Sequence, residues 1–473
     1  MKLKRLSIIL LCLVLTLTFS GCGKKEENGK ETGKETGKET TASVDDITFE
    51  GLKFDINKDL DFGGKTVKIA RYPAIPEPGL TANYDREIAI KEAIEKKYNV
   101  KVEWIKYSSE EELLKNLVLN HTSGTAWADL VFTTTPFMLA ALNNEGVFRA
   151  VDDYIDFSND RFKLTDTATK YVDGKHYSYY PTKYDAGYFI YYNTNLLAEN
   201  NCEDPRELYE AGNWNWESFE KIAKACTKVK SGKTIYGVAG SNILDGMLAS
   251  NGKALVSSDV KNKTAICNIF TEEGKNALEF VRTLAYTDKA VDGTYGTHNG
   301  IETFNNGYAA MLIGPQYYGS HIVQKGIPFE MVPLPLGKDV KTYTNLCQYC
   351  YCYSVSAHSQ YKTEDLLQLA FELERNDPEI EGTYREQDYE GKLGTFIEEY
   401  LDQGNHYFDE TQAQFVYDFI NKEETVNMID WATTDILKII AEKVYRPIYT
   451  GEDVRSHLTS IEPVIKAELE KQF

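Results

Sequence analysis

Polar and aromatic side chains follow two apolar segments of the sequence, at the points where predicted strands end. They are Arg71 and Tyr72 after KTVKIA (65–70), and Thr133, Thr134 and Thr135 after ADLVF (128–132). Ligands of open α/β sheets bind beyond the carboxyl ends of the strands, so these residues are candidates for ligand contacts. A guanidinium, hydroxyls and a flat ring together suit a solute such as a sugar, which has apolar C–H faces and a rim of hydroxyls.

Cysteines form a second group of chemically versatile residues. Six of the eight lie beyond the N-terminal region, at Cys202, Cys226, Cys267, Cys347, Cys350 and Cys352. The run CQYCYC (347–352) has the C-x2-C spacing of half a zinc site, but neither a second such pair nor a histidine pair accompanies it. We therefore expect buried strand cysteines and no metal site. The sequence leaves open whether two of the six form a disulfide outside the cell.

The sequence lacks the motifs of several common enzyme classes. It contains no H-E-x-x-H, no G-x-S-x-G and no P-loop, and its seven histidines have no metal-ligand spacing. Acidic pairs such as Asp152-Asp153 could be proposed as glycosidase carboxylates, but among 72 acidic residues such a pair carries almost no weight. We therefore expect a binding protein without a cofactor rather than an enzyme.

The hydrophobic pattern predicts the elements that would position these residues. KTVKIAR (65–71), VKVEWI (100–105) and ADLVF have the pattern of strands, and apolar residues at helical spacing separate them. Three strands with helical crossovers predict one open α/β lobe.

A second lobe is predicted from residue 187 onward. The aromatic run GYFIYYN (187–193) is a strand candidate, and Asn215 is a candidate N-cap for a helix within NWNWESFEKIAKA (213–225). Further strands are expected at 235–239, 309–313, 329–334 and 348–356, and residues 361–473 are predicted to be mostly helical. The predicted fold class is therefore α/β, with two lobes.

The N-terminal residues have the pattern of an export signal. Three basic residues precede an apolar stretch at 6–19, which is shorter than the roughly 17–25 residues that a membrane-spanning helix needs. The segment FSGC (19–22) resembles the lipobox of bacterial lipoproteins, which implies cleavage before Cys22 and attachment of a diacylglycerol to its thiol. The threefold repeat of Gly-Lys-Glu-Thr at 29–40 has no apolar side chain to bury and predicts a flexible linker.

The negative net charge of the chain argues against a nucleic-acid partner. The whole chain carries a net charge of −20, and without the three basic residues of 1–21 it has 49 basic against 72 acidic residues, or −23. Such a chain repels phosphate backbones, so we expect no nucleic-acid partner.

Several landmarks occur in one order along the chain. They are WADLVF (127–132), VDGKHYSYY (172–180), GYFIYYN (187–193), TFNNGYAAMLIGPQYY (303–318), VPLPLG (332–337) and YTGEDVRSHLTSIEPVIKAELEK (449–471). Together with the lipobox and linker, they resemble the extracellular solute-binding proteins of bacterial ABC importers, of the family-1, sugar-binding type that includes maltose-binding protein. The resemblance covers nearly all of residues 60–471 and implies a two-lobe clamshell of type II, each lobe an open sheet flanked by helices.

The resemblance also implies boundaries and a mode of action. The expected parts are a signal peptide (1–21), a lipidated cysteine with linker (22–45), lobe one (46–186 and 312–353) and lobe two (187–311 and 354–473), with crossings near 185–188, 311–314 and 352–356. Hinge closure would capture a mono- or oligosaccharide and deliver it to the permease of an ABC transporter. A monomer anchored by lipid at the outer face of the bacterial cytoplasmic membrane is implied.

Several ligand contacts are expected from the same resemblance. Asp185 and Tyr188 lie beside the first expected crossing. Relatives often place a tryptophan platform directly after Gly-Pro, where this sequence has Gln316, so either Tyr317 or Tyr318 supplies the ring or the ligand has fewer stacking contacts. Trp431 is a further candidate, with a role in the core as its alternative.

Other cargoes remain open on the sequence alone. Tandem tyrosines at 179–180, 191–192 and 317–318 resemble those of ferric-ion-binding proteins, and peptides or polyamines are further alternatives. A surface protein that presents its ligand to a sensor rather than a permease would have the same features.

Overall fold

The computed structural model describes residues 51–72, 75–79, 82–159, 162–180, 187–240, 243–292, 299–323, 325–347, 349–375 and 410–472. Contacts divide the chain into two units, Met1–Asp46 and Ile47–Phe473, and every element below belongs to the second. The predicted signal peptide, Cys22, the repeat and Asp185 lie outside the described residues. None of the helices in the described ranges is long and apolar enough to cross a membrane.

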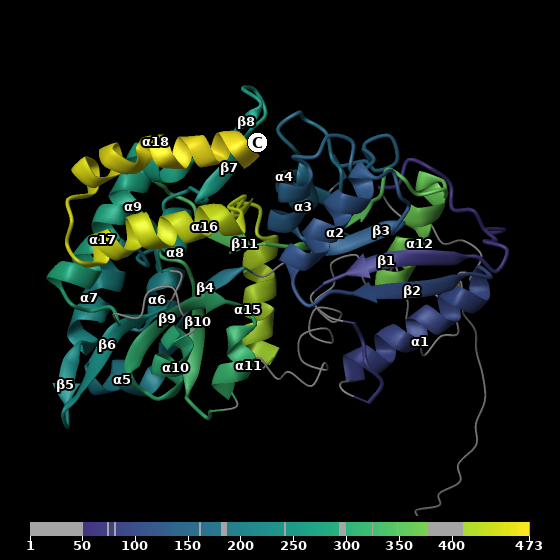
Figure 1. The fold of residues 1–473 in the computed structure, drawn as a ribbon. Helices are drawn as coiled ribbons and strands as arrows, with labels where there is room; N and C mark the ends of the chain where they lie inside the picture. Colours follow the sequence, from purple (N-terminus) through teal and green to yellow (C-terminus); the bar gives the residue numbers. More distant parts are fainter. Residues whose placement is uncertain are drawn as a thin grey trace, which may run out of the picture. The chain divides into compact units, whose positions relative to one another are not determined.

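The first lobe is built on a four-stranded sheet with the order β12-β3-β1-β2 (Figure 1). Its strands are β1 (Thr66–Arg71), β2 (Lys101–Lys106), β3 (Leu130–Thr134) and β12 (Tyr351–Val355). The strand β1 pairs in parallel with both β2 and β3, as strands separated by helices along the sequence predict. The strand β12 adds an antiparallel edge. All five side chains of β3 are buried, which explains its unbroken apolar start.

Helices flank this sheet and complete the core of the first lobe. They are α1 (Ala82–Lys97), α2 (Glu110–Thr122), α3 (Thr135–Ala141), α4 (Lys163–Thr169) and α12 (Thr363–Arg375). One hydrophobic cluster joins Ile69 of β1, Ile94 of α1 and Phe371 of α12. The helix α2 begins at the N-cap Ser109, whose side chain accepts a hydrogen bond from the Glu112 N–H.

The second lobe contains a five-stranded sheet with the order β10-β4-β9-β6-β5. Its strands are β4 (Tyr188–Asn193), β5 (Lys228–Lys230), β6 (Lys233–Ala239), β9 (Ala309–Pro315) and β10 (Phe329–Pro333). The strand β4 is antiparallel to both of its neighbours, whereas β6 and β9 are parallel. All six side chains of β4 are buried, so its tyrosines belong to the packed interior of this lobe.

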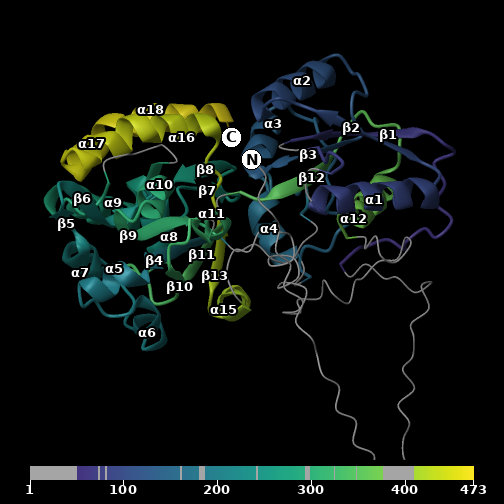
Figure 2. The same ribbon diagram turned by 90° about the horizontal axis from the view of Figure 1, so that it is seen from below.

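Helices of varied length surround the second sheet (Figure 2). They include α5 (Thr194–Glu199), α6 (Pro205–Glu210), α7 (Trp216–Cys226), α8 (Ile243–Ser250), α9 (Glu272–Arg282), α10 (Asn299–Asn305), α11 (Tyr318–Val323), α15 (Glu410–Asn421), α16 (Thr434–Ile440), α17 (Arg446–Tyr449) and α18 (Val454–Gln472). Two small pairs of strands complete it: β7 (Val256–Asp259) with β8 (Thr264–Cys267), and β11 (Thr344–Cys347) with β13 (Val426–Ile429). Asn215 caps α7 in a reciprocal capping box with Ser218, which confirms the predicted N-cap.

Two tryptophans pack at the start of α7 in the second lobe. Trp214 is fully buried and donates its indole N–H to the Pro333 carbonyl at 2.7 Å. Trp216 stacks on Phe280 with ring centroids 4.4 Å apart. Both rings therefore anchor the start of α7 to the lobe.

The chain passes between the two sheets at places that differ in part from the expected boundaries. It leaves the first lobe between Tyr179, which pairs with Tyr353, and Tyr188 of β4. It returns to the first lobe between β11 and β12, and α12 packs there as well. It crosses to the second lobe again between α12 and α15, because α15 contacts β10.

The expected assignment of 312–353 to lobe one is therefore wrong for most of that range, because β9 and β10 pair with β4 in the second sheet. The expected crossing near 311–314 is wrong for the same reason. The assignment of 354–473 to lobe two is wrong for α12, which packs against α1.

Candidate functional site

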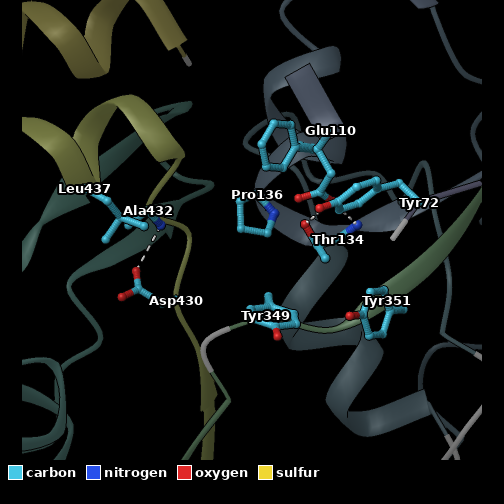
Figure 3. Close-up of a pocket in the computed structure, with 10 residues that line it drawn as sticks. Tyr72, Glu110, Thr134, Pro136, Tyr349, Tyr351, Asp430, Ala432 and Leu437 are labelled. Carbon is cyan, nitrogen blue, oxygen red and sulfur yellow. Dashed lines mark hydrogen bonds between the residues drawn. The ribbon is translucent and has the colours of Figure 1, made fainter. Parts of the chain in front are cut away.

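A cavity of about 360 Å³ lies where residues of both lobes meet the returning segment before β12. Its lining residues are Tyr72, Glu110, Thr134, Pro136, Phe137, Tyr349, Tyr351, Asp430, Ala432 and Leu437. Figure 3 shows Asp430, Ala432 and Leu437 on one side of this space and Tyr72, Glu110 and Thr134 on the other. Tyr72 and Thr134 are at the carboxyl ends of β1 and β3, so the strand-end argument located this wall of the cavity.

A second cavity of about 210 Å³ shares the rings of Tyr349 and Tyr351 with the first. Its other lining residues are Tyr180, Gly187, Tyr188, Pro315, Gln316, Tyr317, Cys347 and Cys350. The two spaces are thus neighbours along the segment that returns from the second lobe to the first. Together they have the mixture of flat rings and polar groups that suits a polyhydroxylated solute.

Glu110 organises the wall contributed by the first lobe. Its Oε1 accepts hydrogen bonds from the Thr133 hydroxyl at 2.8 Å, the Thr134 hydroxyl at 2.6 Å and the Thr134 N–H at 3.1 Å. Burial raises the pKa of the Glu110 carboxyl, and these three hydrogen bonds act in the opposite direction. The carboxyl therefore fixes the end of β3 while it faces the cavity.

The tyrosines of the returning segment are fixed by pairing and stacking. Tyr351 is opposite Thr134 in the antiparallel register of β12 with β3, and its ring stacks on Phe132 with centroids 5.5 Å apart. Burial raises the pKa of the Tyr351 hydroxyl, so this group stays protonated and can donate a hydrogen bond.

Gln316 presents an unusual polar group to the second cavity. The residue is 6% exposed, and its Nε2 is buried without a hydrogen-bond partner among the described residues. Its backbone is held in place, because Gln316 N–H donates to the Gly187 carbonyl at 3.0 Å and Tyr191 donates its hydroxyl to the Gln316 carbonyl at 2.6 Å. Buried amides are nearly always satisfied, so an amide held at a cavity wall in this way is well suited to a ligand acceptor.

Tyr317 and Tyr188 line the same cavity with different exposure. Tyr317 is 39% exposed and packs edge-on against Tyr318, with centroids 5.1 Å apart. Tyr188 is only 1% exposed, as a residue of β4, which has a neighbouring strand on both sides. Tyr317 is therefore the more accessible ring of this wall, and Tyr318 supports it.

Asp430 and its neighbours form the wall contributed by the second lobe. The Asp430 Oδ1 accepts the N–H groups of Val256 at 3.0 Å and Ala432 at 2.9 Å, and burial raises its pKa to about 6. A second buried carboxyl, Asp245, accepts a hydrogen bond from the Tyr445 hydroxyl. Burial and the nearby charge of Asp430 raise the pKa of Asp245 to about 7.

Two predicted contact residues are placed away from the cavity lining. Arg71 forms an ion pair with Glu87 at 2.7 Å, and its guanidinium lies over the ring of Phe132. Trp431 is 2% exposed and stacks on Tyr171, whereas its neighbours Asp430 and Ala432 line the first cavity.

Sequence reasoning missed several lining residues. Tyr349 and Tyr351 are within the CQYCYCY run and lie before and at the first residue of β12, so an argument from the carboxyl ends of strands does not reach them. Glu110, Phe137 and Asp430 carry no distinctive local motif. Cys347, Cys350 and Cys352 are buried, and the described residues contain no group of three or more His, Cys, Asp or Glu side chains that could hold a metal ion.

The described side chains that line the two cavities are all neutral or acidic. Among the described residues around the two cavities, Glu110 and Asp430 are acidic and none is Lys, Arg or His. This lining favours a neutral or cationic solute over an anion.

Comparison with solved structures shows that the fold is shared with binding proteins of known structure. A sugar transporter from Rhizobium etli, solved in an open conformation, is 18% identical and superimposes with a TM-score of 0.60, over 85% of this chain and 99% of that one. The ABC substrate-binding protein of Listeria monocytogenes in complex with cycloalternan is 15% identical, with a TM-score of 0.56 over 86% of this chain and 99% of that one. UgpB of Mycobacterium tuberculosis in complex with glycerophosphocholine is 15% identical, with a TM-score of 0.55 over 86% and 99%.

These similarities agree with the two-lobe α/β fold described above. No curated protein sequence is significantly similar to this chain. The sequence model of the bacterial extracellular solute-binding proteins matches residues 89–377, which is more than half of the chain. The proteins of that family bind solutes and are not enzymes. This chain belongs to the family of bacterial extracellular solute-binding proteins.

Proposed function

We propose that this protein captures a sugar or oligosaccharide in its two neighbouring cavities and delivers it to the permease of an ABC transporter. The observation that carries the proposal is the buried amide of Gln316, whose Nε2 has no hydrogen-bond partner among the described residues, beside the accessible ring of Tyr317. A sugar hydroxyl would accept from the amide while a C–H face packs on the ring.

The two cavities suggest how such a solute would be held. Tyr349 and Tyr351 line both spaces, so one ligand could stack there and extend toward Glu110 in one direction and Gln316 in the other. Structural relatives solved with cycloalternan, maltotetraose and maltotriose support an oligosaccharide as ligand class.

Capture would proceed by closure of the two lobes. Residues of both lobes line the first cavity, and the chain crosses between the lobes more than once. A solute that touches both walls stabilises only the arrangement in which they are close, so binding shifts the population toward the closed form.

The N-terminal region would tether this binding unit to the membrane. We propose that Cys22 carries a diacylglycerol at the outer face of the cytoplasmic membrane and that residues 23–45 form the spacer. Each buried CH₂ of an acyl chain contributes about 0.8 kcal/mol, so two chains anchor firmly.

Isothermal titration calorimetry on the compact unit Ile47–Phe473 tests the proposal. We expect binding of one class among maltodextrins, other oligosaccharides and monosaccharides, and about tenfold weaker binding by Tyr317→Ala. Tyr286→Ala removes another exposed tyrosine of the second lobe and serves as the matched control. Failure of every saccharide to bind, or equal loss of affinity in both variants, would contradict the proposal.

A cationic solute such as a polyamine is the second candidate. The specific observation in its favour is the pair of carboxyls, Glu110 and Asp430, in a lining that has no basic side chain among the described residues. Adding spermidine to the same titration separates the two: its affinity would fall with salt and with Glu110→Gln, whereas the affinity for a neutral sugar would not depend on salt.

A further inference from the structure

We propose that Cys202 and Cys226 form a disulfide bond in the exported protein. Their Sγ atoms are 3.7 Å apart, in contact with each other as thiols. Cys202 is half-buried and Cys226 is buried, so a bond between them would lie just beneath the surface of the second lobe.

The local fold brings these two residues together from separate elements. The helix α5 ends at Glu199, and Asn201 adopts the left-handed conformation with φ 51°. That turn directs the chain back, so the Cys202 N–H donates to the Leu197 carbonyl at 3.0 Å. Cys226 is the last residue of α7, which packs against α5.

Three polar contacts hold the flanking segments side by side. Glu199 forms an ion pair with Lys230 at 2.9 Å, and the Lys228 ammonium donates to the Asn200 side-chain oxygen at 2.7 Å. Glu203 pairs with Lys221 on the other side of the thiols. The proximity of the two sulfurs therefore belongs to a wider junction between 199–203 and 221–230, and oxidation would require little movement of the backbone.

The chemistry requires an oxidant, which would be a disulfide of the oxidoreductase or small-molecule class outside the cell. The Cys202 thiolate attacks this disulfide R–S–S–R, forms a mixed disulfide and releases one thiolate. The Cys226 thiol then loses its proton and attacks the Cys202 sulfur, which releases the second thiolate. Two protein thiols become one disulfide, and two electrons and two protons leave with two RSH molecules.

The order of these steps follows from burial. Burial raises the pKa of the Cys226 thiol to about 12, whereas Cys202 is partly exposed. Only the thiolate is nucleophilic, so Cys202 is the residue that meets the external oxidant first. The extracellular family to which the chain belongs places the pair where disulfides persist.

Peptide mapping of the full chain, exported by a bacterial host and isolated without reductant, tests the proposal. After blocking of free thiols under denaturing conditions, trypsin cuts after Arg206 and Lys224, so the two cysteines fall in different peptides. We expect one linked species with a mass 2 Da below the sum of its two peptides, which separates on reduction. Blocking of either cysteine as a free thiol in most molecules, or linkage to a different cysteine, would overturn the proposal.

Thermal unfolding provides a second measurement that does not depend on labelling. Reductant is expected to lower the Tm of the wild-type chain and to leave the Tm of Cys202→Ala unchanged, because that variant has no bond to lose. Cys267→Ala, which removes a buried cysteine elsewhere in the second lobe, should keep the full response to reductant. An equal response of the wild type and Cys202→Ala would contradict the assignment.

Discussion

Tyr351 lies opposite Thr134 where β12 pairs with β3, so the segment returning from the second lobe ends beside the Glu110 carboxyl that binds Thr134. One wall of the first cavity is therefore an extension of the first lobe's sheet. Any change that loosens the end of β3 should weaken both the fold and the site.

The hydrogen bond between Thr134 and Glu110 provides the first prediction. Thr134→Val removes the hydroxyl that donates to Glu110 at 2.6 Å, while the N–H contact stays. A hydrogen bond to a charged group contributes about 1.5–3 kcal/mol, so we expect the free energy of unfolding to fall by about 1–2 kcal/mol at pH 7 in this half-buried setting. Urea unfolding measures this. Thr134→Ser keeps the donor and should unfold like the wild type; equal losses in both variants would point to packing instead.

The amide of Gln316 provides a prediction with opposite effects on stability and binding. Gln316→Leu replaces a buried donor that has no partner among the described residues with an apolar group of similar size. The unliganded unit should be as stable as the wild type or more stable, because an unsatisfied buried donor costs about 1–3 kcal/mol. Ligand affinity should fall by about two- to tenfold, the equivalent of one lost hydrogen bond.

Thermal unfolding and calorimetry on the same sample check this pair of effects. Gln414→Leu, on the exposed side of α15 where Gln414 donates to Asp418, is the control and should leave the affinity unchanged. A variant of Gln316 that loses stability and keeps its affinity would show that the amide has a structural role.

The buried carboxyl of Asp245 predicts how stability depends on pH. Its pKa is raised from the usual 3.8 to about 7, so the folded state holds this proton more tightly than the unfolded chain does. The resulting stability is fully present below about pH 4 and is lost as the pH rises through about 7. Asp245→Asn keeps an oxygen to accept the Tyr445 hydrogen bond and removes the titration. We therefore expect the variant to gain stability over the wild type between pH 5 and pH 8, by up to about 4 kcal/mol.

Urea unfolding at pH 5 and pH 8 measures that difference. Asp153→Asn neutralises an exposed aspartate of the first lobe and should show no such gain at high pH. Parallel pH profiles for the wild type and Asp245→Asn would contradict the prediction.

The proposed lipid anchor predicts the fate of Cys22→Ser. Without the thiol no diacylglycerol can be attached, so the binding unit should move from the detergent phase to the aqueous phase of a Triton X-114 partition. Cys12→Ser, which changes the other N-terminal cysteine inside the apolar stretch, should leave the partition as in the wild type. Retention of Cys22→Ser in the detergent phase would show that another segment holds the protein at the membrane.

The sequence by itself predicts the local elements well, because their signals are local. Alternating apolar residues mark β1 and β2, an unbroken apolar run marks β3, and the aromatic run at 187–193 marks β4. Asn215 marks the start of α7 through hydrogen bonds to residues within one turn of it. The end of a strand is also a local signal, because it can be recognised without knowing the strand's neighbours. This signal identified Tyr72 and Thr134 as residues of the site.

Only the tertiary structure decided which lobe each later element joins and which side chains face the cavities. The strands β9 and β12 are both almost wholly buried, yet β9 pairs with β4 in the second sheet and β12 with β3 in the first. Strand partners are chosen by packing among residues far apart in sequence, which no local pattern records. The same long-range pairing brings Tyr349 and Tyr351 beside Glu110, so a segment that stands out in the sequence only for its cysteines becomes the shared wall of both cavities.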